Sequence, residues 1–197
     1  MGLIGPVFKK IFIFNAIKCL PHALSIMGTK NYREEKMSSQ NTFKRVEIKY
    51  LLNSEQKNEL AEKMRDRMVP DPHGNATIRN IYYDTPTFLL ARRSIEKPKY
   101  KEKLRVRSYR RVDLSEPVFV ELKKKCKSVV FKRRITLPQG DALDFLGGKD
   151  LSEESFEHKK SKPTDRQIAK ELRYFRDMYK TLRPVVFLSN DRSAYYG

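Results

Sequence analysis

Apolar and charged residues alternate in several short stretches, and this period of two constrains the fold more than any other feature of the chain. Because successive side chains of a strand point to opposite faces, such alternation predicts half-buried β-strands. The clearest stretches are residues 43–52, 103–110, 118–125, 129–137 and 185–194. Helical spacing predicts helices over residues 54–68 and from Thr164 to a stop at Pro184. The pattern therefore predicts an α+β fold, an antiparallel sheet with flanking helices.

The polar face of the predicted strands is repeatedly basic. Arg105 and Arg107 share one face of their strand, and Lys132 and Arg134 share one face of theirs. A half-solvated sheet explains the alternation itself. It explains the choice of residues less well, because like charges on neighbouring strands repel one another. A bound polyanion would remove that repulsion.

The overall charge agrees with an anionic partner. The chain has 42 Lys and Arg against 24 Asp and Glu, which gives a net charge of +18. Nucleic acid, an anionic membrane surface and a phosphate chain are the partners this predicts, although a solvated basic surface would also account for the excess. The 39% hydrophobic content is that of one globular domain.

Residues 1–42 differ in composition from the rest. They contain a short apolar patch around Phe12 that is far below the ~20 residues of a membrane-spanning helix. We expect residues 1–42 to be a disordered extension or a mis-assigned start, with initiation at Met37. Weak contact with a membrane surface is the alternative. Cys19 and Cys126 give no disulfide or zinc pattern, which favours a reducing, cytoplasmic compartment.

Several short motifs, taken together in order, resemble a known family. They are FKRVEIKYL (43–51), IYYDTP (81–86), KLRVR (103–107), VELKKK (120–125), KRR (132–134) and the stretch 183–195. The sequence from 43 to 197 thus resembles the vacuolar transporter chaperone (VTC) domain, a polyphosphate polymerase domain of the triphosphate tunnel metalloenzyme, or CYTH-like, superfamily. The resemblance implies an antiparallel β-barrel whose basic tunnel holds a phosphate chain. Family members continue with further strands, so we expect the barrel to be incomplete at the carboxyl end.

The resemblance also implies roles for individual residues. It implies catalytic roles for Arg105, Arg107, Lys123 and Arg192, phosphate binding by Arg45, Lys49, Lys132 and Arg134, and metal binding by Glu47 and Glu121. Ion pairs that orient the basic residues are an equally good interpretation of the two glutamates.

The implied reaction is transfer of the ATP γ-phosphoryl group to the end of a polyphosphate chain, with Mn²⁺ or Mg²⁺ as cofactor. The attacking phosphate oxygen is already anionic, so no strong general base is needed, and positioning and charge stabilisation carry the catalysis. The alternatives are an impaired module that binds polyphosphate or triphosphate without turnover and a tunnel triphosphatase. Nucleic-acid binding is not expected, because the aromatic residues mostly share the apolar faces of the predicted strands.

Overall fold

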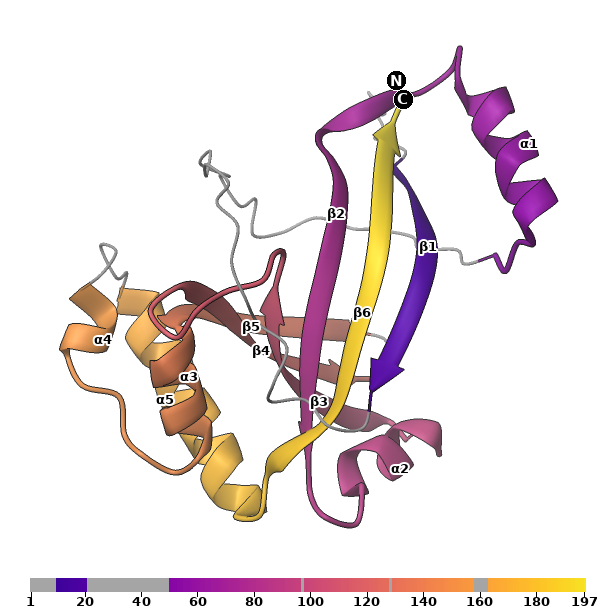
Figure 1. The fold of residues 1–197 in the computed structure, drawn as a ribbon. Helices are drawn as coiled ribbons and strands as arrows, with labels where there is room; N and C mark the ends of the chain where they lie inside the picture. The colour runs from indigo at the N-terminus through magenta and orange to yellow at the C-terminus, as the bar shows by residue number, and fades with distance from the viewer. Residues whose placement is uncertain (1–9, 21–49, 97, 128, 158–162) are drawn as a thin grey trace, which may run out of the picture. The chain divides into compact units, whose positions relative to one another are not determined.

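The computed structural model describes residues 10–20, 50–96, 98–127, 129–157 and 163–197 (Figure 1). The strands are β1 (Lys10–Leu20), β2 (Val69–Asp84), β3 (Tyr100–Ser108), β4 (Pro117–Cys126), β5 (Val129–Pro138) and β6 (Arg183–Tyr196). The helices are α1 (Ser54–Met64), α2 (Leu89–Ile95), α3 (Gln139–Leu146), α4 (Glu154–Glu157) and α5 (Pro163–Tyr179). The predicted α+β class, a sheet with flanking helices, is confirmed.

All the described strands belong to one six-stranded sheet in the order β1-β6-β2-β3-β4-β5. The neighbours from β2 to β5 pair antiparallel. The edge strands of this sheet are β1 and β5, within the part of the chain that the structure describes.

The strands predicted at 103–110, 118–125, 129–137 and 185–194 are observed as β3 to β6. The strand predicted at 43–52 lies mostly outside the described residues, and its last three residues, 50–52, are not in a strand. These residues are exposed and lead directly into α1, where Asn53 accepts from the backbone N–H of Gln56 in a capping box. Strand β1 falls within the predicted extension, 1–42, where no strand was predicted. The domain boundary at residue 43 stays a prediction.

The two predicted helices form with shifted ends. Helix α1 ends at Met64, four residues early, because β2 begins at Val69. The second, α5, ends at Tyr179, where Lys180 turns into the left-handed region with φ 48°. Pro184 lies inside β6 instead, so its predicted role as the helix stop is wrong.

The apolar core lies on one face of β3, β4 and β5, under α3 and α5 (Figure 1). Val118, Val120 and Leu122 of β4 are completely buried there, and Phe145 of α3 and Phe175 of α5 close over them. These three are alternate residues, so every other residue of this part of β4 faces the core. The intervening residues must then face the other side of the sheet.

The described chain divides into two compact units. Ala76–Arg192 belong to the unit that contains this core, while α1, the beginning of β2 and Ser193–Gly197 belong to the other. Among the described helices, none combines the length and the apolarity that crossing a bilayer requires.

Candidate functional site

The face of β3, β4 and β5 opposite the core carries three rows of side chains fixed by strand register. The first row joins Asn80, Arg107, Phe119 and Thr136 from β2 to β5. The second joins Tyr82, Arg105, Glu121 and Arg134, and the third joins Lys103, Lys123 and Lys132. The alternation that buries Val120 and Leu122 thus places their neighbours on one shared surface, which we call the cationic face.

Glu121 is the centre of this face and is only 2% exposed. Arg105 donates to its Oε2 through Nε at 2.7 Å, and Arg134 donates to its Oε1 through Nε at 2.6 Å. The ammonium of Lys132 lies 3.1 Å from Oε1, and Nε of Arg107 lies 3.9 Å from Oε2. One buried carboxylate therefore holds four cations contributed by β3 and β5.

Electrostatics keep this carboxylate ionised. Burial alone would raise the pKa of Glu121, but the charges of Arg105, Arg107, Arg134 and Lys132 outweigh burial and lower the pKa to about 2. Burial is also the main cause that lowers the pKa of Lys132, against the attraction of Glu121. The group of five carries four positive charges against one negative charge, which leaves a net excess of three.

Neutral side chains orient the arginines. Asn80 Oδ1 accepts from Nε of Arg107 at 2.9 Å, and the Tyr82 hydroxyl accepts from Arg105 at 3.0 Å. The guanidinium of Arg134 lies 4.4 Å from the centroid of the Phe119 ring, a cation–π contact. These contacts fix the direction of planar, bidentate donors before any anion arrives.

Tyr109 stands beside the same arginines. Its hydroxyl is 3.5 Å from Arg134, and Arg107 lies over its ring at 5.9 Å. Burial would raise the pKa of Tyr109, but Arg134 and Arg107 together lower it below its usual value of 10. The phenol is thus another polar group on the cationic face.

The lysine row is the least neutralised part of the face. Lys103 and Lys123 are exposed, and no carboxylate of the described residues lies within ion-pair distance of either. Lys132, directly opposite Lys123, is also half exposed. Like charges placed side by side on three strands destabilise a sheet unless an anion lies between them.

The structure brings together most of the predicted site residues that it describes. Arg105, Arg107, Lys132, Arg134 and Glu121 form one cluster, and Lys123 stands in the next row. Arg192 is half-buried on β6, two strands from β3, and alternation from the core residue Phe187 puts it on the same face. Arg45, Glu47 and Lys49 lie outside the described residues.

Sequence reasoning missed Tyr82, Phe119 and the amide of Asn80 as members of the site. Tyr109 shares the parity of Arg105 and Arg107, so alternation does place it on this face. Because Tyr82, Tyr109 and Phe119 lie among the arginines, the expectation that aromatics mostly share the apolar faces is wrong for this face. The sequence does indicate the position of Phe119, because Val118 and Val120 on either side of it take the core positions of the strand. Phe131, at the start of β5, shares the parity of the core residues Ile135 and Leu137 but is 48% exposed.

The described residues do not provide a metal site of their own. No group of three His, Cys, Asp or Glu side chains that could hold an ion occurs among them. Both oxygens of Glu121 already accept from cationic donors, so this side chain fits an internal counterion better than a metal ligand. Its contacts therefore favour the ion-pair interpretation of Glu121, and its metal role stays a prediction.

Comparison with known proteins agrees with the resemblance seen in the sequence. The profile of the VTC domain family matches residues 44–197, well over half of the chain. The chain belongs to the VTC domain family. No curated protein matches this VTC domain chain.

Among solved structures, a crystal structure from Bacillus halodurans, provisionally named an adenylate cyclase, is similar at 13% sequence identity. The similarity covers 75% of this chain and 76% of that one with a TM-score of 0.39.

Proposed function

We propose that the cationic face binds the phosphates of ATP and of a polyphosphate chain, and that the protein transfers the γ-phosphoryl group of ATP to the end of that chain. The observation that carries the proposal is the convergence of Arg105, Arg107, Lys132 and Arg134 on a single carboxylate. Four cations held by one anion leave donors for further anionic oxygens, and planar guanidinium groups bind such oxygens in pairs. Membership of the VTC domain family supports the same conclusion.

The transfer requires no nucleophilic side chain. A terminal oxygen of polyphosphate forms a bond to the γ-phosphorus of ATP, the bond from that phosphorus to the β–γ bridging oxygen breaks, and ADP leaves with the electron pair. Arg105, Arg107 and Arg134, oriented by Tyr82, Asn80 and Phe119, stabilise the charge on the transferred group. Mn²⁺ or Mg²⁺ remains a prediction, and no step here depends on either. A cytoplasmic compartment, which supplies ATP, is part of the same proposal.

Binding is tested with Lys123→Ala, because no ion pair within the described chain depends on Lys123. Loss of one charge-assisted contact should weaken the affinity for inorganic triphosphate about tenfold, measured by calorimetry. Lys170→Ala removes the same charge from the exposed side of α5 and is the matched control. Equal affinities for the two variants would rule out the cationic face as the binding site.

The reaction is tested by incubating the whole chain with ATP and Mn²⁺ and measuring both polyphosphate and free phosphate. Formation of polymer is expected. Free phosphate without polymer would instead show a triphosphatase, and binding without either product would show a binding module. An RNA oligonucleotide that binds more tightly than triphosphate would contradict the choice of partner, which we do not expect because Arg134 already covers one face of the Phe119 ring.

A further inference from the structure

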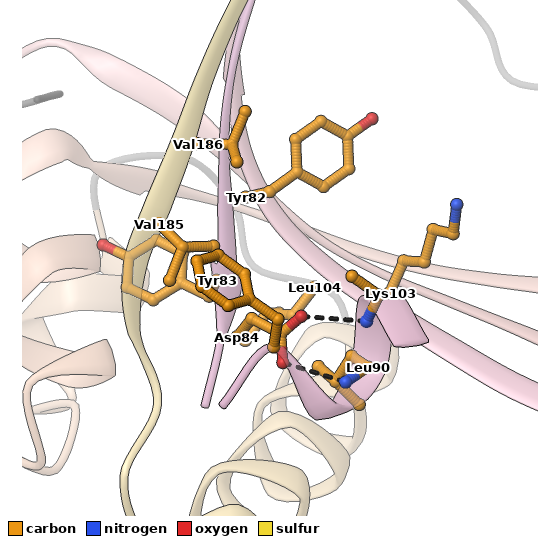
Figure 2. Close-up of a pocket in the computed structure, with 10 residues that line it drawn as sticks. Tyr82, Tyr83, Asp84, Leu90, Lys103, Leu104, Val185 and Val186 are labelled. Atoms are coloured by element: carbon orange, nitrogen blue, oxygen red, sulfur yellow. Dashed lines mark hydrogen bonds between the residues drawn. The ribbon is translucent and has the colours of Figure 1, made fainter. Parts of the chain in front are cut away.

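A cavity of about 180 Å³ lies at one end of the sheet, between β2, β3, β6 and α2, and has no part in the proposed chemistry so far (Figure 2). Its walls are mostly apolar and aromatic. The lining residues include Tyr82, Phe88, Leu90, Val185, Val186 and Lys103. An apolar cavity of about 150 Å³ is large enough to bind benzene, so this one has room for an aromatic ring.

The Asp84 carboxylate and the Tyr82 hydroxyl, two polar groups of the cavity wall, already have hydrogen-bond partners. The Asp84 carboxylate accepts from the backbone N–H groups of Thr85, Leu90 and Ala91 at 2.7, 2.9 and 2.9 Å. This carboxylate caps the beginning of α2 and keeps the wall in place. The Tyr82 hydroxyl in turn accepts from Arg105. A ligand would therefore be held mainly by burial and stacking, because the Asp84 carboxylate is already occupied by backbone N–H groups.

The cavity adjoins the cationic face through two shared residues. Tyr82 lines the cavity with its ring and contacts Arg105 with its hydroxyl, 3.0 Å from the guanidinium. Lys103 lines the cavity and also begins the row that continues with Lys123 and Lys132. Figure 2 shows the Tyr82 ring, Val186 and the Lys103 ammonium extending to one side of the strands, while Tyr83 and Val185 turn to the other.

We propose that this cavity binds the base of the nucleoside triphosphate donor, while its phosphates run past Lys103 onto the cationic face. The inference rests on the proposed function and extends it by assigning the donor's base to a separate subsite. An aromatic ring joined to a chain of negative charges matches an apolar cavity that opens beside a row of lysines. Because its walls are mostly apolar, the subsite recognises a flat ring and discriminates little between adenine and guanine.

The test compares ATP with ribose 5′-triphosphate, which carries the same sugar and phosphates but no base. The unaltered chain should bind ATP about tenfold more tightly by calorimetry, the gain typical of one stacked base. ATP and GTP should bind within about threefold of each other. Equal affinities for ATP and ribose 5′-triphosphate would overturn the inference while leaving the proposed function intact. Failure to bind either compound would overturn the proposed function itself.

Two variants test whether the tenfold gain in affinity for ATP comes from the cavity. Val186→Phe fills the cavity, and Phe88→Ala removes part of its wall. Each variant should bind ATP only as tightly as it binds ribose 5′-triphosphate. The affinity for ribose 5′-triphosphate should be the same in the variants as in the unaltered chain. Phe131→Ala is the matched control, because Phe131 is 48% exposed against 46% for Phe88 but lies outside the cavity. If Phe88→Ala folds normally and keeps the tenfold preference, the base binds elsewhere and the inference is wrong.

Discussion

Two buried glutamates lie on neighbouring strands of the same sheet, and their main partners differ in charge. Glu121 of β4 is 2% exposed and faces four cations, whereas Glu102 of β3 is 6% exposed and faces two phenols. The Tyr100 hydroxyl donates to Glu102 at 2.5 Å, the Tyr179 hydroxyl donates at 3.1 Å, and Lys124 lies at 4.0 Å. Burial, followed by the hydrogen bond to Glu102 and the Glu102 charge, raises the pKa of both tyrosines.

The difference shows what a buried carboxylate can be used for. A phenol bound to Glu102 attaches α5 to β3, and an incoming phosphate has little to gain from a neutral donor. The guanidinium groups around Glu121 keep their charge and have further N–H donors, so they can bind phosphate while Glu121 holds them in place. Glu121 is thus an organiser of a binding surface, and Glu102 joins a helix to a strand.

The largest expected effect comes from neutralising Glu121. Glu121→Gln leaves the four cations without their counterion and should lower the free energy of unfolding by about 3 kcal/mol at pH 7, measured with urea. The estimate takes the low end of the usual range because the arginines are partly solvated. Inorganic triphosphate should restore part of the loss, since a polyanion can replace the missing charge.

Glu102→Gln is the matched control for this comparison. The amide keeps an oxygen that both tyrosines can approach, so the loss should be about 1 kcal/mol, and triphosphate should restore none of it. Equal losses in the two variants, or rescue of both by triphosphate, would show that the two carboxylates do the same thing.

Acid should remove the contribution of Glu121 over a defined range. Its pKa is about 2 in the folded protein and 4.5 is its ordinary value. A carboxylate whose pKa is lowered by folding stabilises the protein fully above the ordinary value and loses that contribution as the pH falls through the folded one. The stability difference between the unaltered chain and Glu121→Gln should therefore shrink between pH 4.5 and 2, measured by urea unfolding at several pH values. A difference that stays constant down to pH 2 would contradict the ion-pair account.

The sequence predicted the strands of the site well and their mutual arrangement poorly. Period-two alternation placed Arg105, Arg107, Lys132 and Arg134 on the polar side of their strands because Leu104, Val106 and Ile135 were plainly apolar. That all four would meet at Glu121 depends on the register between strands, which no single stretch of sequence encodes. The family resemblance, not the pattern, suggested that they lie around one channel.

Alternation predicted burial better in the middle of the sheet than at the start of β5. Val118, Val120 and Leu122 are buried under α3 and α5, whereas Phe131 shares the parity of the core residue Ile135 and is exposed. The base subsite was equally out of reach, because its walls come from β2, β3, β6 and α2, which are far apart in the chain. Residues such as Val186 and Phe88 give no sign of a ligand until the fold brings them together.

The smallest expected effect separates the two faces of β3. Glu102 and Lys103 are adjacent but point to opposite sides, so loosening the Glu102 contacts should not reach the cationic face if the strand itself stays paired. Tyr179→Phe removes one hydrogen bond to Glu102 and should cost about 1 kcal/mol of stability by urea unfolding. The affinity of Tyr179→Phe for inorganic triphosphate should remain within about twofold of that of the unaltered chain. Tyr174→Phe is the matched control, because Tyr174 is an exposed tyrosine on the same helix, and its affinity should also stay within that range. A clear loss of triphosphate affinity in Tyr179→Phe alone would mean that α5 positions the lysine row through β3, and that the two glutamates belong to one coupled network.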